Sequence, residues 1–259
     1  MRRILVPVLV LLLAVLALGG VAVARGDAST VTRARLERSL PDVFAHRYVE
    51  QARLQGRTLT PASLHAVAMC DKHGPDVADV GPGGDWNCLM SWTDPEVPMP
   101  PEGYGKFELN VHSDDCWTAS GPSRLTGFLT MTDAAGREVT NPVFEFDGCF
   151  DPDGDDAPTG VEFPSLLAVT STTLTPDATG AAGVQVTCGT GAEGCAGQLT
   201  VTAGGTELGS VPYDLAEEST AALALPGPLP AGTAQVTLAF RLDKGTGPSS
   251  PVTLPVGTG

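Results

Sequence analysis

Four of the six cysteines and all three tryptophans of this 259-residue chain fall between Cys70 and Cys149. Three segments of the same stretch, residues 86–92, 107–111 and 144–146, alternate apolar with polar side chains. Alternation with a period of two is typical of strands that bury one face. The stretch therefore predicts an antiparallel sheet through residues 85–150, with its cysteines at strand edges or in the connecting loops.

The six cysteines are predicted to form three disulfides, because their number is even and the apolar amino terminus described below predicts that they lie outside the cytoplasm. The spacing favours Cys70 with Cys88, Cys116 with Cys149, and Cys188 with Cys195 as a bridge between neighbouring strands. Four cysteines in the first stretch allow three pairings, so the other connectivities stay open there. Each bridge would stabilise the fold by about 2–4 kcal/mol, mainly by restricting the unfolded chain.

An unbroken apolar run of 21 residues, 4–24, follows two arginines at the amino terminus and ends in a small-residue pattern before Arg25. Such a segment is typical of a signal peptide, and at this length it could also remain as a membrane anchor. Residues 1–24 are therefore predicted to be one or the other. Both alternatives predict a secreted or single-pass cell-membrane protein whose remaining residues lie outside the cytoplasm, with membrane contact only through this segment.

The charge balance is acidic, with 15 Lys and Arg against 30 Asp and Glu. Nucleic acid is therefore not an expected partner, because binding it requires a basic surface that neutralises phosphates. The 31 glycines, 22 prolines and an aromatic content of 5% favour short strands joined by many turns over a helical protein.

Residues 28–69 have a helical pattern. Ser29 or Thr30 could cap a first helix, and apolar residues recur at helical spacing until Gly56. Thr60 followed by Pro61 predicts a second start, leading through residues 64–70. One or two helices are thus expected to cover the apolar face of the sheet, which makes residues 28–150 a disulfide-bonded α+β domain.

An acidic, proline-containing stretch, residues 151–164, is predicted to be a linker to a second domain at residues 165–259. Short β-type runs separated by Gly, Pro, Asp and Thr follow it, which predicts a sandwich of about seven strands. The runs are residues 166–174, 184–187, 198–202, 221–225, 236–240 and 252–254.

Two resemblances accompany these patterns. The motifs at residues 81–88, 114–119 and 141–150 resemble uncharacterised exported proteins of actinobacteria, which implies an extracytoplasmic α+β module and no known activity. The stretch from Val184 to Thr200 resembles the immunoglobulin-like repeats of exported actinobacterial proteins. This resemblance implies an all-β immunoglobulin-like sandwich, although the absence of a tryptophan there argues against an antibody-type domain.

The linker also contains the best candidate for a metal site. Asp151, Asp153, Asp155 and Glu162 stand at positions 1, 3, 5 and 12 of the spacing with which EF-hand loops bind calcium. Position 6, normally glycine, is Asp156, and no helical pattern flanks the loop. A solvated acidic linker without cofactor and a weak calcium site that stiffens the joint therefore stay open as alternatives.

No catalytic or cofactor-binding motif occurs in the chain. The four histidines lack the spacing of a zinc site, and no nucleophile elbow is present. The sequence therefore predicts a binding or structural module at the cell surface that is not an enzyme, with a protein or cell-envelope component as partner. The alternatives are a secreted hydrolase using carboxylates such as Asp114, Asp115 or Glu145, or a calcium-stiffened spacer.

Overall fold

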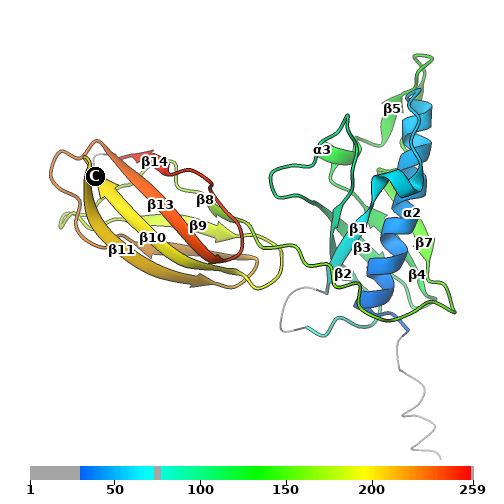
Figure 1. Ribbon diagram of the computed structural model, residues 1–259, viewed down its shortest axis with the longest axis horizontal. Helices are drawn as coiled ribbons and strands as arrows, with labels where there is room; N and C mark the ends of the chain where they lie inside the picture. Colours follow the sequence, from blue (N-terminus) through cyan, green and yellow to red (C-terminus); the bar gives the residue numbers. More distant parts are fainter. Residues whose placement is uncertain (1–29, 73–76, 258–259) are drawn as a thin grey trace, which may run out of the picture.

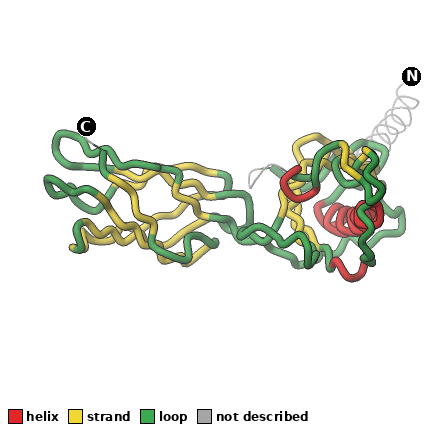
Figure 2. Tube along the Cα trace, turned by 90° about the horizontal axis from the view of Figure 1, so that it is seen from above, coloured by secondary structure: helices red, strands yellow, loops and turns green. Residues whose placement is uncertain are grey.

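Antiparallel sheets and one long helix make up the computed structural model, which describes residues 30–72 and 77–257 (Figure 1). Residues 30–150 form a five-stranded sheet covered by the helix, and residues 165–257 form two further sheets. We call these the N-terminal part and the C-terminal part. Figure 2 shows the two parts one after the other along the long axis. The linker, residues 151–164, connects them in the chain.

The expected single-pass membrane topology needs correction. Within residues 30–72 and 77–257, no helix is long and apolar enough to cross a bilayer. The apolar run on which that expectation depended, residues 4–24, lies outside the described residues, as does the predicted signal-peptide cleavage after it.

Among the described residues, one long helix, α2 (Arg33–Leu54), precedes the sheet. It begins after Thr32, whose side chain accepts a hydrogen bond from the Arg35 N–H, so the cap lies two residues beyond the expected Thr30. The helix continues through Pro41. Its buried stripe has a spacing of four residues and packs on the sheet; the stripe consists of Leu36, Leu40, Phe44 and Tyr48.

The second helical start at Thr60 is confirmed only for one turn. Thr60 caps η1 (Pro61–Leu64) through a reciprocal pair of hydrogen bonds with Ser63. The helical pattern expected from Leu64 to Cys70 is wrong, because the chain leaves η1 at His65 and enters a strand, β1. That strand pairs with the one carrying Cys88, and the disulfide joins the two.

The N-terminal sheet confirms the three alternating segments and adds two strands to them. Its order is β1-β2-β3-β4-β7, and every pair is antiparallel. The strands are β1 (Val67–Asp71), β2 (Gly83–Ser91), β3 (Gly105–Val111), β4 (Cys116–Ser120) and β7 (Glu145–Cys149). Between β4 and β7 the chain forms α3 (Ser123–Thr126) and a hairpin of β5 (Thr130–Thr132) and β6 (Glu138–Thr140).

The C-terminal part consists of two antiparallel sheets that share one hydrophobic cluster. The sheet orders are β12-β9-β8 and β11-β10-β13-β14. Six of the strands lie at the predicted runs: β8 (Leu167–Val169), β9 (Gly183–Cys188), β10 (Cys195–Ala203), β12 (Ser219–Ala224), β13 (Gln235–Lys244) and β14 (Val252–Pro255). The seventh, β11 (Thr206–Leu215), has no counterpart among the runs.

The three disulfides join the pairs that the spacing favours. Cys70 and Cys88 lie directly opposite each other on β1 and β2, and Cys116 and Cys149 do so on β4 and β7. Cys116 begins β4 and Cys149 ends β7, at strand ends as expected, whereas Cys70 and Cys88 lie inside β1 and β2 and not in a loop. The third bond, Cys188 to Cys195, connects β9 of one sheet to β10 of the other. It spans two sheets rather than two adjacent strands, because the chain crosses between sheets at that loop.

Candidate functional site

A groove of about 640 Å³ lies along the outer side of the N-terminal sheet, between α2 and β1. We call it the edge groove, because β1 is the first strand of the sheet order. Its wall is mostly apolar, with a few charged or polar groups at the rim. The lining residues are Glu37, Arg38, Pro41, Asp42, Ala45, Pro61, Ala62, His65, Ala66, Val67, Ala68, Thr159 and Val161.

The two walls of the edge groove come from α2 on one side and from η1 and β1 on the other. Residues 38, 41, 42 and 45 of α2 share one side of the helix by their spacing of three and four. The opposite wall begins at η1, which ends at His65 in the left-handed conformation with φ of 47°. That conformation is uncommon for a residue with a side chain, and such residues often cluster at functional sites. It turns the chain from η1 into β1.

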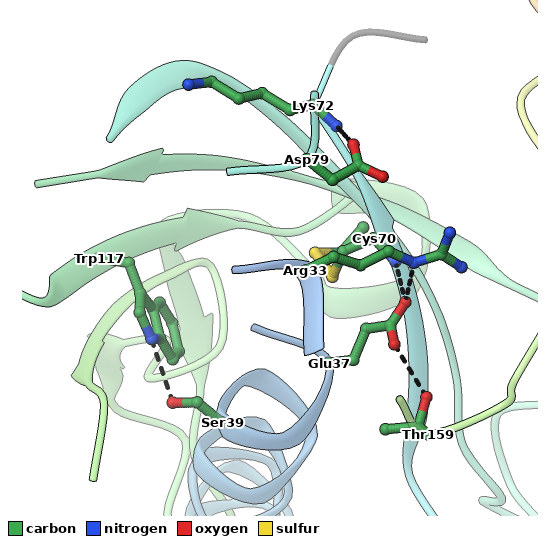
Figure 3. Close-up of a disulfide and its surroundings, with 9 residues drawn as sticks. Arg33, Glu37, Ser39, Cys70, Lys72, Asp79, Trp117 and Thr159 are labelled. Atoms are coloured by element: carbon green, nitrogen blue, oxygen red, sulfur yellow. Dashed lines mark hydrogen bonds and ion pairs between the residues drawn. A yellow bond between two sulfur atoms is a disulfide. The ribbon is translucent and has the colours of Figure 1, made fainter. Parts of the chain in front are cut away.

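Glu37, in the second turn of α2, is one of the residues that line the edge groove. Its carboxylate is buried and accepts hydrogen bonds from the Cys70 N–H at 3.0 Å, Arg33 Nε at 2.6 Å and Thr159 Oγ1 at 2.9 Å (Figure 3). These donors come from β1, α2 and the linker. A buried carboxylate is tolerated only with such partners, so Glu37 joins three segments at one point.

The linker is held against α2 by arginines. Arg38 donates two hydrogen bonds to the Ala157 carbonyl, at 3.1 and 2.7 Å, and Arg35 donates one to the Asp151 carbonyl at 2.8 Å. Arg33 pairs with Glu162 at 3.1 Å. Burial alone would lower the pKa of Arg33, but the hydrogen bond and charge of Glu37, with the charges of Glu162 and Asp79, raise it above its ordinary value.

The four residues of the predicted calcium site lie along this linker and not around one point. Asp155 faces Arg38 at 3.8 Å, and Glu162 pairs with Arg33. The Asp151 and Asp155 carboxylates also accept hydrogen bonds from the backbone two residues ahead, at Asp153 and Ala157. Over the described ranges, no group of three or more His, Cys, Asp or Glu could hold a metal ion. Calcium binding by these residues stays a prediction.

The carboxylates of the hydrolase alternative do not converge. Asp114 and Asp115 precede Cys116, which pairs with Cys149 at one end of the β4–β7 ladder, whereas Glu145 is opposite Ser120 at the other end. The rise of a strand places Glu145 roughly 15 Å from Asp115. Carboxyl pairs of glycoside hydrolases are about 5–10 Å apart. These acids therefore do not form a catalytic pair with one another.

A buried polar network lies beneath the aromatic core. The Asp94 carboxylate accepts hydrogen bonds from Tyr48 Oη and Arg57 Nη1, both at 2.7 Å, and from the Glu96 N–H. Burial alone would raise the pKa of Asp94, but these hydrogen bonds and the Arg57 charge lower it below its ordinary value. Burial, followed by the bond to Asp94, raises the pKa of Tyr48 to about 12. Because every member has a partner, this network fixes the loop after β2 to the helix.

A smaller cavity of about 190 Å³ lies where the two parts meet. Arg33 and Glu162 line it from one side, and Glu217 lines it from the C-terminal part. Burial and then the nearby charges of Asp71, Glu218 and Asp79 raise the pKa of Glu217, while Arg33 opposes the shift. The cavity is therefore acidic, with one arginine as its main counter-charge.

Sequence reasoning did not single out any residue of the edge groove. The wall residues are small and apolar, and the segment that forms β1 has a helical pattern in the sequence. The disulfide was the available signal, because a cysteine paired with the strand residue Cys88 had to lie beside that strand.

Comparisons with known proteins leave the family undetermined. Neither a protein-family model nor a curated protein matches the chain. A solved structure described as a Ca2+-stabilized adhesin that helps an Antarctic bacterium reach out and bind ice has a TM-score of 0.23 and 16% identity. The match covers 76% of this chain and 45% of that one, so this chain spans less than half of that protein's length. A TM-score this low does not establish a common fold.

Proposed function

We propose that this chain is an extracellular binding or structural module without catalytic activity, and that the edge groove is its binding site. The groove itself is the observation that supports the proposal. Its volume of about 640 Å³ is within the range of ligand sites, and it combines an apolar wall with a few polar groups at the rim. The partner in this proposal is a protein or a cell-envelope component.

Three disulfides support the extracellular location. All six cysteines are paired, and such bonds persist mainly in oxidising compartments. This agrees with the resemblance of the N-terminal part to exported actinobacterial proteins, which stays a prediction.

We further propose that residues 28–150 and 165–259 are separate domains and that the second is an immunoglobulin-like sandwich. Two separate hydrophobic clusters support the division, one in each part. Seven antiparallel strands in two sheets around one cluster support the sandwich.

The proposal is tested by mapping a library of small organic fragments on the isotope-labelled, oxidised chain by NMR. We expect shifts to concentrate at Ala62, Ala66 and Ala68 in the edge groove. Val67→Lys should abolish them, because Val67 lines the groove and is 38% exposed, so the lysine is tolerated. Val80→Lys is the matched control, since Val80 is 50% exposed outside the groove. Fragments that avoid the groove, or turnover of glycosidase, esterase or peptidase substrates, would refute the proposal.

A further inference from the structure

We propose that the exposed edge of β12 pairs with β12 of a second copy of this chain, in antiparallel orientation. β12 comes first in the sheet order β12-β9-β8, so among the described strands it has a neighbour on one side only. This surface belongs to the C-terminal part, and the inference goes beyond the proposed function without depending on the edge groove. An edge strand can pair with another chain when its outward backbone groups are accessible and have no partner.

The hydrogen bonds around β9 show which residues of β12 point outward. The Gln185 carbonyl on β9 accepts a hydrogen bond from the Thr170 N–H, which follows β8. Gln185 is directly opposite Ala222, so no ladder bond joins these two residues. Three residues further along, the Leu225 N–H does bond across, to the Ala182 carbonyl at 3.0 Å. Since bonding alternates along an antiparallel strand, Ala222 turns its N–H and C=O away from β9.

The outward-facing residues of β12 are accessible. Thr220 and Ala224 are two residues from Ala222 on either side, so their backbone groups point the same way. All three residues are exposed, and an open groove of about 510 Å³ is lined in part by Ala222 and Ala224. No hydrogen bond from elsewhere in residues 30–72 and 77–257 reaches their N–H or C=O groups. Each position therefore offers a donor and an acceptor to another strand.

The sequence of β12 lacks the features that commonly protect an edge strand, which are proline, charged side chains and bulges. The strand reads Ser-Thr-Ala-Ala-Leu-Ala and runs in unbroken register with β9. By contrast, β11, the first strand of the other sheet order, contains Pro212 and Asp214, and its register shifts beside Gly209. Of these two edges, β12 is the one open to pairing.

The spacing of the outward-facing residues favours a second copy as the partner. In an antiparallel pair centred on Ala222, this residue lies opposite Ala222 of the second copy, and Thr220 lies opposite Ala224. This register lets all three outward-facing residues of each copy exchange backbone hydrogen bonds. The contact uses the same surface on both copies, so it closes as a dimer and joins two three-stranded sheets into one.

Charges do not oppose this pairing, although each copy has a net charge of −15. β12 itself is uncharged, and the carboxylates of Glu217 and Glu218 precede it. The two-fold register places Glu218 opposite Pro226 of the second copy, so the carboxylates of the two copies lie at opposite ends of the strand pair. Glu218 also binds Lys106 of the N-terminal part, which puts the two N-terminal parts at opposite ends as well.

The small size of the contact makes the dimer weak. β12 has six residues, whereas a standard interface uses about 20–30 on each side. We therefore expect a Kd on the order of 0.1–1 mM. Such a dimer is populated where many copies are held close together, because attachment side by side raises their effective concentration.

The test measures self-association of the full oxidised chain by sedimentation equilibrium and by amide exchange at rising concentration. We expect a monomer–dimer equilibrium near 0.1–1 mM, on the order given above, with exchange at Thr220, Ala222 and Ala224 slowing as the dimer forms. Ala222→Pro should abolish the dimer, because it removes a donor from each copy, while an edge position with an outward N–H tolerates proline. Circular dichroism checks that this variant folds.

A charge exchange then tests the register. Ala222→Lys and Ala222→Glu each place like charges opposite each other at the two-fold axis, and each should weaken the dimer roughly two- to fivefold. An equal mixture of the two variants places Lys opposite Glu and should restore at least the wild-type affinity. Gln185→Lys is the matched control, since Gln185 is exposed beside Ala222 but on the central strand β9, and it should dimerise like the wild type.

Three results would overturn the proposal. They are a chain that stays monomeric at about 1 mM, an association that Ala222→Pro leaves intact, and a mixture of the charged variants that associates no more tightly than either alone. If an added peptide protects the β12 amides while the chain stays monomeric, the edge belongs to another partner and the proposal fails too.

Discussion

Asp94 is a buried charge whose hydrogen-bond partners are all supplied by neighbouring segments. Tyr48 reaches it from α2, Arg57 from the chain after the helix, and the Glu96 N–H from its own loop. A hydrogen bond to a charged group stabilises the fold more than one between neutral groups. Removing one partner leaves the other buried without a hydrogen bond, which lowers stability further. The residue therefore offers a direct measure of what this network contributes.

We predict that Tyr48→Phe lowers the free energy of unfolding of the N-terminal part by about 2 kcal/mol at pH 7. The buried ring stays, and only the hydroxyl that donates to Asp94 is lost. Urea unfolding followed by tryptophan fluorescence measures this part alone, because all three tryptophans lie within it. Tyr213→Phe is the control, since its hydroxyl is buried with no hydrogen-bond partner among the described residues. It should leave stability unchanged or slightly higher by circular dichroism.

The same tyrosine predicts a loss of stability in alkali. The pKa of Tyr48 is raised from 10.0 to about 12 in the folded chain, so its protonated form stabilises the fold fully below pH 10. That contribution disappears as the pH rises from 10 to about 12, because the unfolded chain ionises first. Urea titrations at several pH values should show a steeper fall in this window for the wild type than for Tyr48→Phe. Identical slopes would contradict the raised pKa.

At the scale of elements, alternation correctly predicted three of the five strands of the N-terminal sheet, whereas β1 and β4 were not predicted. Segments 86–92 and 107–111 are now β2 and β3, with their apolar side chains in the core. β11 escaped the same reasoning because Gly209 and Pro212 interrupt its pattern. Both are tolerated because β11 is an edge strand, and its register shifts beside Gly209. β1 has only five residues, too few for an alternation of apolar and polar side chains to be recognised in the sequence. The edge groove was therefore not predicted, because β1 forms one of its walls.

The linker was expected to be either a solvated acidic stretch or a weak calcium site, and neither alternative included its contacts with α2. Acidic and proline-rich composition says nothing about which cations lie nearby in the fold. Arginines of the first two turns of the helix, half-buried Arg33 and exposed Arg38 among them, turned out to contact it. Sequence patterns describe an element's buried side well, whereas contacts between polar surfaces depend on the tertiary arrangement.

We predict that Arg38→Gln loosens the linker locally. It removes the two hydrogen bonds to the Ala157 carbonyl and the ion pair with Asp155, so amide exchange at residues 155–159 should quicken several-fold. Global stability should fall by less than about 1 kcal/mol, because the side chain is largely exposed. Arg47→Gln on the same helix is the matched control, since Arg47 pairs with Glu50 and not with the linker. Equal exchange in both variants would show that the arginines do not hold the linker.

At the scale of the whole molecule, the relative placement of the two parts depends on a small contact. Tyr104 Oη donates to the Thr190 carbonyl at 2.8 Å, and its ring lies 5.6 Å from that of Phe163 between centroids. Lys106 pairs with Glu218 at 2.9 Å, but both side chains are more than a third exposed, so the pair is weak and sensitive to salt. The aromatic residue is therefore the main constraint on the joint.

We predict that Tyr104→Ala frees the two parts to move relative to each other without unfolding either. The residue is only half-buried and lies just before β3, so the sheet keeps its strands, while the joint loses a hydrogen bond and a ring contact. X-ray scattering should show a broader distribution of interatomic distances at long range, with thermal unfolding midpoints nearly unchanged. Phe128→Ala is the matched control, because that side chain is 72% exposed and precedes β5 by two residues. Figure 1 shows β5 on the side of the N-terminal part away from the C-terminal part. If Tyr104→Ala scatters like the control, the contact at Tyr104 does not fix the relative placement of the two parts. The arginines of α2 that bind the linker would then be the main constraint on that placement.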